Sequence, residues 1–523
     1  MPMKKPTLFT LATATVSVYL AVGVPTAAAA LSAPVLKWSR GGCYASWCET
    51  GWYSSPALVD VNRDGIQDVV VSAYSLVALN GKNGKLIWRA GGTNNRTWPG
   101  IVVADIDKDG SQDIVTAQAG GYLSVYKLSG ILKWQQQPIT EELRGLLAAD
   151  LDGNNSTLEL VVTGARGNGV NTWVYNSNGA LRSGWPQLNG SNGYAWGVYN
   201  SNAAAGNLDP SDARLELLVP SDVHYINGYK PDGALLPANA TAFPGKRYWG
   251  QVGVWESAIP EQRGWGACDG IRAESYRANF ADGPAVIADV NGDGKRELVV
   301  TGNMYDCKAG YPPSRYVSLF IFNKDRTRFR ASGYDWRTIP INTGAPLSED
   351  YNVIESAVPN PVVADLDGDG KREILYPSYD GRLHAVWLDK RKHGSWPYSV
   401  YNAAEKVIRF ASEPIVADLD GNGKAEVIFT SWVQKASKRT GKLHILSALG
   451  QKLFEVNLPL GIGSDWNGAL AAPTIGNIDS DSDLEVILNT AHAGVVAYDL
   501  PGTAKARVLW GTGRGSYLRN AAL

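Results

Sequence analysis

One short acidic signature recurs eight times along the chain, each time between two apolar segments. Its clearest copy is Asp365-Leu366-Asp367-Gly368-Asp369-Gly370, closed by Glu373 and flanked by the apolar residues 361–364 and 374–375. Oxygen-bearing residues stand at positions one, three and five, glycine at position six and an acid at position nine. The copies begin at residues 60, 105, 150, 207, 289, 365, 418 and 477. A motif repeated this often indicates a repeat architecture, in which each copy falls at the same place of one structural unit.

The residue types in this loop are those that bind calcium. Hard cations such as Ca²⁺ take six to eight oxygen ligands from carboxylates, amides and backbone carbonyls, and a glycine at position six permits the sharp turn. The closing acid stands at position nine instead of twelve and strand-forming residues flank the loop, which argues against an EF-hand. The alternative is a set of solvated acidic turns that bind nothing, because Asp, Asn and Gly are ordinary turn residues.

The eight copies differ in how well they keep the pattern. The copies that begin at Asp150 and Asn207 carry one extra residue before the closing glutamate, and the last copy has Ser482 in place of the glycine. The predicted calcium ligands are Asp60, Asn62, Asp64, Asp68, Asp105, Asp107, Asp109, Asp113, Asp150, Asp152, Asn154, Glu159, Asn207, Asp209, Glu216, Asp289, Asn291, Asp293, Glu297, Asp365, Asp367, Asp369, Glu373, Asp418, Asp420, Asn422, Glu426, Asn477, Asp479, Asp481 and Glu485.

The spacing of the copies predicts the fold. Successive copies begin 45 to 82 residues apart, and a period of this size is typical of one four-stranded blade of a β-propeller. An apolar run precedes each loop and a β-rich run follows it; an alternating strand comes next, often after a turn such as Asn83-Gly84. We therefore predict an all-β, eight-bladed β-propeller with calcium-binding loops in its blades, as one domain over residues 31–523. Seven blades plus an irregular unit is the alternative.

Two segments resemble the fourth strand of a blade, which commonly ends in Trp. One is residues 34–38 near the N-terminus, and the other is residues 507–510 near the C-terminus. Either segment can complete the last blade, so the sequence leaves the closure of the ring open.

The strand, the Asp-x-Asp/Asn-x-Asp-Gly-x-x-Asp/Glu loop and the strand after it resemble the FG-GAP/VCBS repeat, over roughly residues 50 to 510. This family includes the integrin α-subunit propeller, lectin-like propellers of bacteria and fungi, and calcium-dependent rhamnogalacturonan lyases. The resemblance implies calcium in the loops, and it is specific for the fold and not for an activity. The Phe-Gly and Gly-Ala-Pro signatures of integrins are poorly kept, which gives an integrin-like adhesive role little support.

The N-terminus indicates export. Lys4 and Lys5 precede an apolar stretch over residues 8–24 that ends in small residues, which is the layout of a secretory signal peptide over residues 1–30. A retained membrane anchor is the alternative. We expect a secreted, periplasmic or cell-surface protein, in which the four cysteines form two disulfides. The favoured pairs, one of three possible connectivities, are Cys43–Cys48 and Cys268–Cys307.

Charge and motif content argue against several classes of function. The 49 basic and 50 acidic residues form no basic stripe, so nucleic acid and anionic membranes lose support as partners. No second hydrophobic span follows the signal peptide, and we expect a monomer without membrane insertion. The sequence has no HExxH motif, nucleophile elbow or Gly-rich phosphate loop, and no catalytic residue is assigned.

The aromatic residues suggest a ligand-binding face. The chain has 18 Trp and 24 Tyr, and many lie just before the first strand of a repeat, which is the face opposite the calcium loops. Exposed rings stack on the apolar faces of sugars, whereas the alternative is that the rings pack between blades. The candidate ligand-binding residues are Trp52, Trp98, Trp196, Trp249, Trp265 and Trp466.

Two functions from different classes follow. The first is a secreted calcium-binding module for binding or adhesion, with a carbohydrate (a glycan) or a surface protein as its partner. The second, alternative function is a calcium-dependent polysaccharide lyase similar to the rhamnogalacturonan lyases, which needs a base for the C5 proton of the sugar and cations for the uronate carboxylate. No arrangement of Arg and Glu singles out such a pair, so the sequence favours binding over catalysis.

Overall fold

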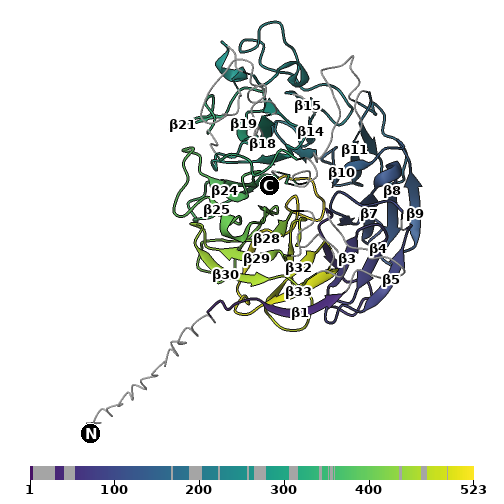
Figure 1. The fold of residues 1–523 in the computed structure, drawn as a ribbon, viewed down its shortest axis with the longest axis vertical. Helices are drawn as coiled ribbons and strands as arrows, with labels where there is room; N and C mark the ends of the chain where they lie inside the picture. The colour runs from purple at the N-terminus through teal and green to yellow at the C-terminus, as the bar shows by residue number, and fades with distance from the viewer. Residues whose placement is uncertain are drawn as a thin grey trace.

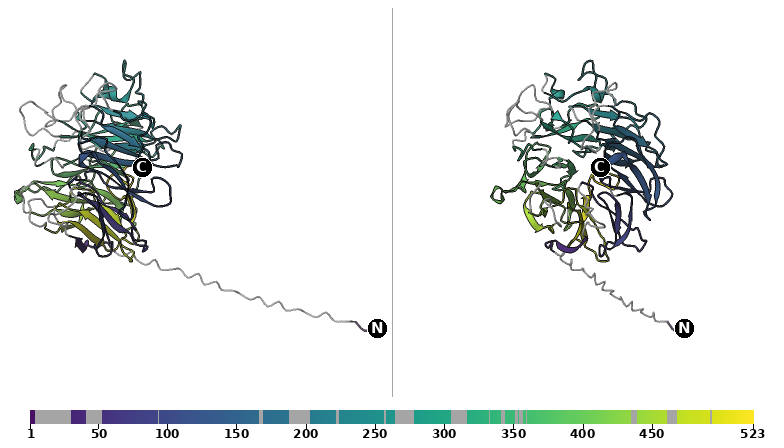
Figure 2. Two further views of the ribbon diagram at one scale, coloured as in Figure 1. Left: turned by 90° about the vertical axis from the view of Figure 1, so that its right-hand side faces the viewer. Right: turned by 45° about the vertical axis from the view of Figure 1, so that its right-hand side comes forward.

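The computed structural model describes residues 1–3, 30–40, 53–92, 94–165, 169–187, 203–221, 224–255, 258–263, 278–304, 316–331, 333–340, 344–350, 353, 357–358, 360–434, 439–460, 468–491 and 493–523. Eight antiparallel β-sheet blades stand around a central axis in the order of the sequence (Figure 1). Turned on its side, the ring is a thick disc (Figure 2). The predicted eight-bladed propeller is confirmed, and the seven-bladed alternative is wrong.

Each blade begins with a buried strand at the axis, and in blades 1, 2, 6, 7 and 8 it ends in a more exposed strand at the rim. Blade 1 consists of β2 (Ala57–Val59), β3 (Asp68–Ser72), β4 (Leu76–Leu79) and β5 (Leu86–Ala90), and blade 2 of β6 (Val102–Ala104), β7 (Asp113–Ala117), β8 (Leu123–Lys127) and β9 (Leu132–Gln136). Blade 3 consists of β10 (Leu143–Ala149), β11 (Glu159–Gly164) and β12 (Thr172–Tyr175), and blade 4 of β13 (Ala204–Gly206), β14 (Glu216–Pro220) and β15 (Ile226–Tyr229).

Blades 5 to 8 continue the same pattern. Blade 5 consists of β17 (Ala285–Ala288), β18 (Glu297–Met304) and β19 (Tyr316–Phe322), and blade 6 of β22 (Val362–Ala364), β23 (Glu373–Pro377), β24 (Arg382–Val386) and β25 (Tyr398–Ser399). Blade 7 consists of β27 (Ile415–Asp418), β28 (Glu426–Val433), β29 (Lys442–Leu446) and β30 (Lys452–Asn457), and blade 8 of β31 (Thr474–Gly476), β32 (Leu484–Asn489), β33 (Val495–Leu500) and β1 (Val35–Arg40). The remaining elements are short: β16 (Ala278–Asn279), β20 (Arg330–Ala331), β21 (Tyr334–Asp335), β26 (Arg409–Ala411), β34 (Arg507–Trp510), η1 (Ala119–Gly121), η2 (Trp249–Gln251), η3 (Pro260–Gln262) and η4 (Ala403–Glu405).

The acidic signature has the same register in every blade. It connects the innermost strand to the second strand, and its closing acid is always paired with the residue that precedes its first position. The pairs are Val59–Asp68, Ala104–Asp113, Ala149–Glu159, Gly206–Glu216, Ala288–Glu297, Ala364–Glu373, Ala417–Glu426 and Gly476–Glu485. The two loops with an extra residue therefore absorb it inside the turn, because a shift of one residue would turn every side chain of the strand to the other face.

The N-terminal segment, and not the C-terminal one, closes the ring. Strand β1 pairs antiparallel with β33 and becomes the rim strand of blade 8, with Val35 opposite Asp499. Strand β34 has a similar sequence, but it pairs with the innermost strand of blade 7, with Trp510 opposite Val416. The sequence of a strand that ends in Trp therefore does not determine whether the strand lies at the rim or at the axis.

The C-terminal residues 511–523 fill the centre of the ring, where Figure 1 shows the C-terminus. Backbone N–H groups of innermost strands donate to this segment from Val103, Ala148, Ala205, Ile287 and Ile475, at 2.8 to 3.1 Å. The fully buried Arg519 donates to the carbonyl oxygens of Ile101, Pro56 and Gly513 at 2.7 to 2.9 Å. We call residues 511–523 the central plug.

Tryptophan side chains connect neighbouring blades near the rim. The indole Nε1 of six tryptophans donates to a backbone carbonyl oxygen of the following blade at 2.7 to 3.0 Å, between Trp38 and Gly81, Trp134 and Ser177, Trp185 and Pro231, Trp249 and Lys324, Trp336 and Leu388, and Trp396 and Ala448. A glycine with positive φ often lies beneath the ring: a Cβ on Gly179 would stand 3.0 Å from Trp134. These contacts give many tryptophans of the chain a packing role.

Candidate metal loops and central pocket

The acidic loops, numbered 1 to 8 by blade, hold their carboxylates with their own backbone. In loop 6, the two carboxylate oxygens of Asp365 accept hydrogen bonds from the N–H groups of Gly368 (2.7 Å) and Gly370 (3.0 Å). Gly370 has a φ of +84°, which favours glycine at this position. Glu373 accepts from the N–H of Leu366 at 2.7 Å. The turn thus fixes the first and the closing acid before any ion is considered.

In four loops, three acids bring one oxygen atom each within 4.8 Å of the others. These groups are Asp105, Asp107 and Asp109 of loop 2; Asp365, Asp367 and Glu373 of loop 6; Asp418, Asp420 and Glu426 of loop 7; and Asp479, Asp481 and Glu485 of loop 8. Converging carboxylates are the donor set of hard cations. The structure therefore brings together predicted ligands into clusters that can hold a metal ion.

Burial makes the closing acids of three consecutive loops costly to ionise. It raises the pKa of Glu297 and Glu373 to about 8 and that of Glu426 to about 7, and the neighbouring carboxylates of each loop add to the effect. All three side chains are buried and already accept one backbone hydrogen bond. A bound cation would remove this cost, since it favours the charged form of each acid. The residues of loops 5, 6 and 7 therefore fit an oxygen-ligated cation.

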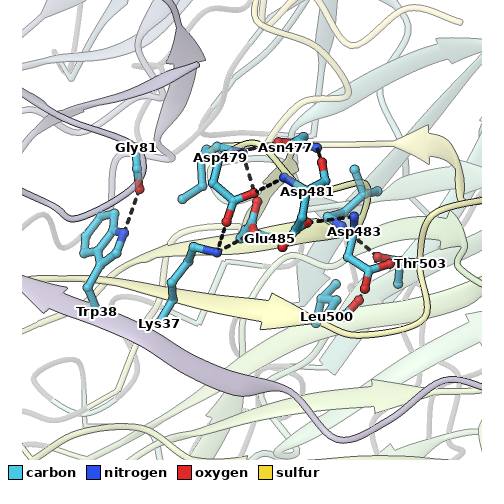
Figure 3. A network of polar contacts seen from close by, with 12 residues as sticks. Lys37, Trp38, Gly81, Asn477, Asp479, Asp481, Asp483, Glu485, Leu500 and Thr503 are labelled. Carbon is cyan, nitrogen blue, oxygen red and sulfur yellow. Dashed lines mark hydrogen bonds and ion pairs between the residues drawn. The ribbon is translucent and has the colours of Figure 1, made fainter. Parts of the chain in front are cut away.

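In three other loops a basic side chain bridges the third-position acid and the closing acid. In loop 8, Lys37 bonds Asp479 and Glu485, the latter at 3.0 Å (Figure 3). In loop 2, Lys133 lies 2.7 Å from Asp107 and 2.8 Å from Asp113. In loop 3, Arg182 pairs with Asp152 and, at 3.0 Å, with Glu159. Sequence reasoning missed these cations, although Lys37 and Lys133 share one signal: each stands directly before the Trp of a rim strand.

Loops 1 and 4 keep the pattern less well. In loop 1 the shorter closing acid Asp68 accepts backbone hydrogen bonds at both oxygens, from Val61 and from Gly81 at 3.2 Å each. In loop 4 the amide of Asn207 donates to the carbonyl oxygen of Asp212 at 2.6 Å. The closing group of loop 1 and the first-position group of loop 4 thus already have hydrogen-bond partners within the protein.

A small pocket lies beside the central plug, at the end of the innermost strands opposite the acidic loops. Its volume is about 60 Å³, and its lining includes Tyr53, Trp98, Asn360, Glu413 and Arg514. The buried Glu413 accepts from the amide of Asn360 at 2.7 Å and from the backbone N–H of Arg514 at 2.8 Å. The plug therefore forms part of the wall of this pocket.

The structure corrects the aromatic expectation at two positions. Trp249 is fully buried and holds Lys324 of the next blade, so its ring is not exposed for stacking on a sugar. Trp98 is 7% exposed, with Tyr53 stacked at 3.5 Å on it and Arg144 4.1 Å from the ring centre. Trp98 lines the pocket, but its ring is largely covered. The other candidates (Trp52, Trp196, Trp265 and Trp466) and all four cysteines lie outside the described residues.

A β-propeller with an acidic loop after each innermost strand defines the class of this protein. The family model of the FG-GAP-like repeat matches residues 60–116 and 365–429, which contain loops 1, 2, 6 and 7. The chain therefore contains FG-GAP-like repeats in these two segments, in agreement with the resemblance of its sequence. Among the described residues, no helix has the length and apolarity that crossing a membrane requires.

Solved structures support the fold alone. The chain is similar to the V. cholerae biofilm matrix protein Bap1, with 13% identity, a TM-score of 0.51, and coverage of 90% of this chain and 92% of the other. It is also similar to Saccharomyces cerevisiae Sqt1, with 12% identity, a TM-score of 0.54, and coverage of 89% and 100%. A comparison with curated proteins finds no match.

Proposed function

We propose that this protein is a calcium-binding β-propeller that acts outside the cell as a binding or adhesion module, with a glycan or a surface protein as its ligand. Loops 5, 6 and 7 carry the metal part of the proposal. Each ends in a buried glutamate whose pKa is raised. In loops 6 and 7 three acids also converge, and no Lys or Arg is bonded at the first, third or closing position of the three loops in the part of the chain described here.

Calcium would supply positive charge where the chain itself supplies only carboxylates. Asp365, Asp367 and Glu373 would hold it in loop 6, and Asp418, Asp420 and Glu426 would do so in loop 7. In loop 5 the ligands would be Asp289, Asn291, Asp293 and Glu297. The ion would bind the folded chain and not the unfolded one, so it would stabilise the propeller by mass action. Its role in this proposal is structural.

The ligand would bind at the pocket face. Loops that precede the innermost strands of several blades meet there, and Tyr53, Trp98 and Glu413 offer aromatic and polar groups around the pocket. Export is proposed from the residues 1–30, and the disulfides Cys43–Cys48 and Cys268–Cys307 suit an oxidising compartment.

The test combines metal and ligand measurements on the purified protein. Calcium titration calorimetry should show binding, and co-sedimentation with a panel of acidic and neutral polysaccharides should show retention of the calcium-loaded protein. No heat of calcium binding and no retention on any polymer would contradict the two parts separately. Rising absorbance at about 235 nm on a uronate polymer, the signal of an unsaturated product, would replace the binding module by the lyase alternative.

A further inference from the structure

We propose that loops 2, 3 and 8 are closed by a basic side chain of the protein itself and do not take calcium. This inference rests on the proposed calcium binding of loops 5, 6 and 7. The propeller would then contain two kinds of acidic loop: those that bind calcium from solution and those whose acids pair with a Lys or Arg side chain of the protein.

The geometry of loop 8 supports this inference directly. The ammonium group of Lys37 bonds both the third-position acid Asp479 and the closing acid Glu485 (Figure 3). These carboxylates are the ones that would ligate the ion. Lys37 is only 18% exposed at its side chain and Glu485 is fully buried, so the pair is held away from water and is screened little by salt.

Loop 2 repeats the arrangement. Lys133 contacts Asp107 at 2.7 Å, Asp113 at 2.8 Å and Asp109 at 3.9 Å, so that it faces the third, the closing and the fifth position of the loop. A divalent ion at the same point would share these oxygens with an ammonium group and be repelled by it. The site therefore holds one cation or the other.

Loop 3 uses arginine for the same purpose. The guanidinium of Arg182 spans the third-position Asp152 and the closing Glu159, and its Nε donates to the carbonyl oxygen of Pro231 at 3.1 Å. The third contact ties the side chain to the next blade. Arg182 thus occupies the loop and orients itself by a bond that calcium would not disturb.

A β-bulge explains how the two lysines reach their loops. The pairing of β1 with β33 skips from Leu36 to Trp38, and that of β9 with β8 skips from Leu132 to Trp134. Lys37 and Lys133 are the skipped residues, and bulges commonly redirect a side chain in this way. The rim strands of blades 1 and 7 have the same bulge with the uncharged Ile87 and Leu453. The residue at the bulge therefore distinguishes a lysine-closed loop from an open one.

The two kinds of loop are grouped around the ring. Loops 8, 2 and 3 belong to the arc from blade 8 through blade 1 to blade 3, whereas loops 5, 6 and 7 lie in consecutive blades on the remaining part of the ring (Figure 1). Removing calcium should then loosen one arc and leave the other intact. Hydrogen exchange should rise in β17, β22 and β27 with chelator, and remain unchanged in β6, β10 and β31.

The experiment counts calcium ions per chain by native mass spectrometry of the full-length exported protein. Asp107→Asn and Asp367→Asn change the third position of loops 2 and 6. Asp367→Asn should lower the count by one, whereas Asp107→Asn should leave it unchanged. Lys133→Met and Lys37→Met should each raise the count by one, because the released carboxylates become a calcium site. Lys442→Met removes a lysine that pairs with Glu455 outside the loops, and it should not change the count.

The outcomes separate this inference from the proposed function. A wild-type chain without calcium, together with no effect of Asp367→Asn, would remove the proposed calcium binding. A calcium-loaded wild type in which Asp107→Asn lowers the count by one would overturn the inference alone. If Lys133→Met fails to fold, the comparison of Asp107→Asn with Asp367→Asn still decides the question.

Discussion

The indole Nε1 of Trp134 in blade 2 donates a hydrogen bond to the carbonyl oxygen of Ser177 in blade 3 at 2.9 Å. Trp88 takes the corresponding place between blades 1 and 2. A Cβ built on Gly130 would lie 2.9 Å from the Trp88 ring, just as a Cβ built on Gly179 would lie close to the Trp134 ring. The buried Nε1 of Trp88, however, has no hydrogen-bond partner among the residues that the structure describes. The two residues therefore separate the contribution of the ring from that of the hydrogen bond.

Trp134→Phe should lower the free energy of unfolding by about 1 kcal/mol more than Trp88→Phe, because only Trp134 loses a hydrogen bond in addition to ring area. Urea unfolding followed by circular dichroism measures both variants. Equal losses in the two variants would mean that the bond between blades adds nothing to ring packing.

Calcium should raise the melting temperature of the wild-type protein. Each occupied site should add roughly 2.7 kcal/mol to the free energy of unfolding when calcium is in hundredfold excess over the Kd of the site. Glu373→Gln should diminish the rise, because the variant removes the closing charge of loop 6. Differential scanning calorimetry with and without EGTA measures the effect, and Asp389→Asn, an exposed carboxylate that pairs with His393 outside the loops, is the control. A melting temperature indifferent to EGTA would count against calcium.

Without calcium, the stability of the protein should fall as the pH rises from about 5 to 8. Burial raises the pKa of Glu297 and Glu373 to about 8, so the folded chain binds these protons more tightly than the unfolded chain does. The stabilisation is complete below the unfolded pKa and is lost as the pH rises through the folded pKa. Melting temperatures of the metal-free protein across this range test the sign, and Glu297→Gln with Glu373→Gln should flatten the slope.

Arg519→Met should destabilise the protein by about 3 kcal/mol or more, because it leaves several buried carbonyl oxygens around the central plug without their donor. Arg507→Met is the matched control, since Arg507 is exposed on β34. Chemical unfolding of the two variants gives the difference. If the variants were equally stable, the hydrogen bonds of the plug would have no energetic weight.

Trp98→Ala should lower stability by about 3 kcal/mol, in the range of buried aromatic truncations, because Tyr53 and Arg144 lose the ring between them. Thermal unfolding tests this prediction. Trp98→Phe keeps an aromatic ring and should therefore lose much less stability than Trp98→Ala. Unchanged stability combined with lost polysaccharide binding would instead make Trp98 a ligand residue, as the sequence suggested.

The repeated loop made the architecture predictable because a hydrogen-bonded turn depends mainly on local residues. In loop 6 the N–H of Gly370 donates to the carboxylate of Asp365 within the turn, and the strands on either side of the loop pair with each other. The position of the acids in each blade could therefore be predicted without a structure, and eight blades were favoured over seven. The identity of the cation in each loop could not, because Lys37 comes from a strand at the opposite end of the chain.

For a related reason, the sequence could not predict the different roles of two similar strands and of two tryptophan side chains. Residues 34–38 and 507–510 have nearly the same pattern, yet one lies at the rim and the other at the axis. Trp249 and Trp98 are equally aromatic, and only their neighbours show that one connects two blades while the other lines a pocket. Contacts between distant segments decide both cases.

The pairing of β1 with β33 also bears on the order in which this protein can assemble. Lys37 and Glu485 are separated by 448 positions, so the N-terminal strand stays without its partner until nearly the whole chain is available. Contacts of such long sequence separation slow folding and leave an unpaired strand edge exposed in the meantime. A permuted chain, with β1 moved to follow β33, would turn this distant pairing into a local hairpin. Its refolding rate compared with that of the natural order would show how much of the folding time is spent on closing the circle.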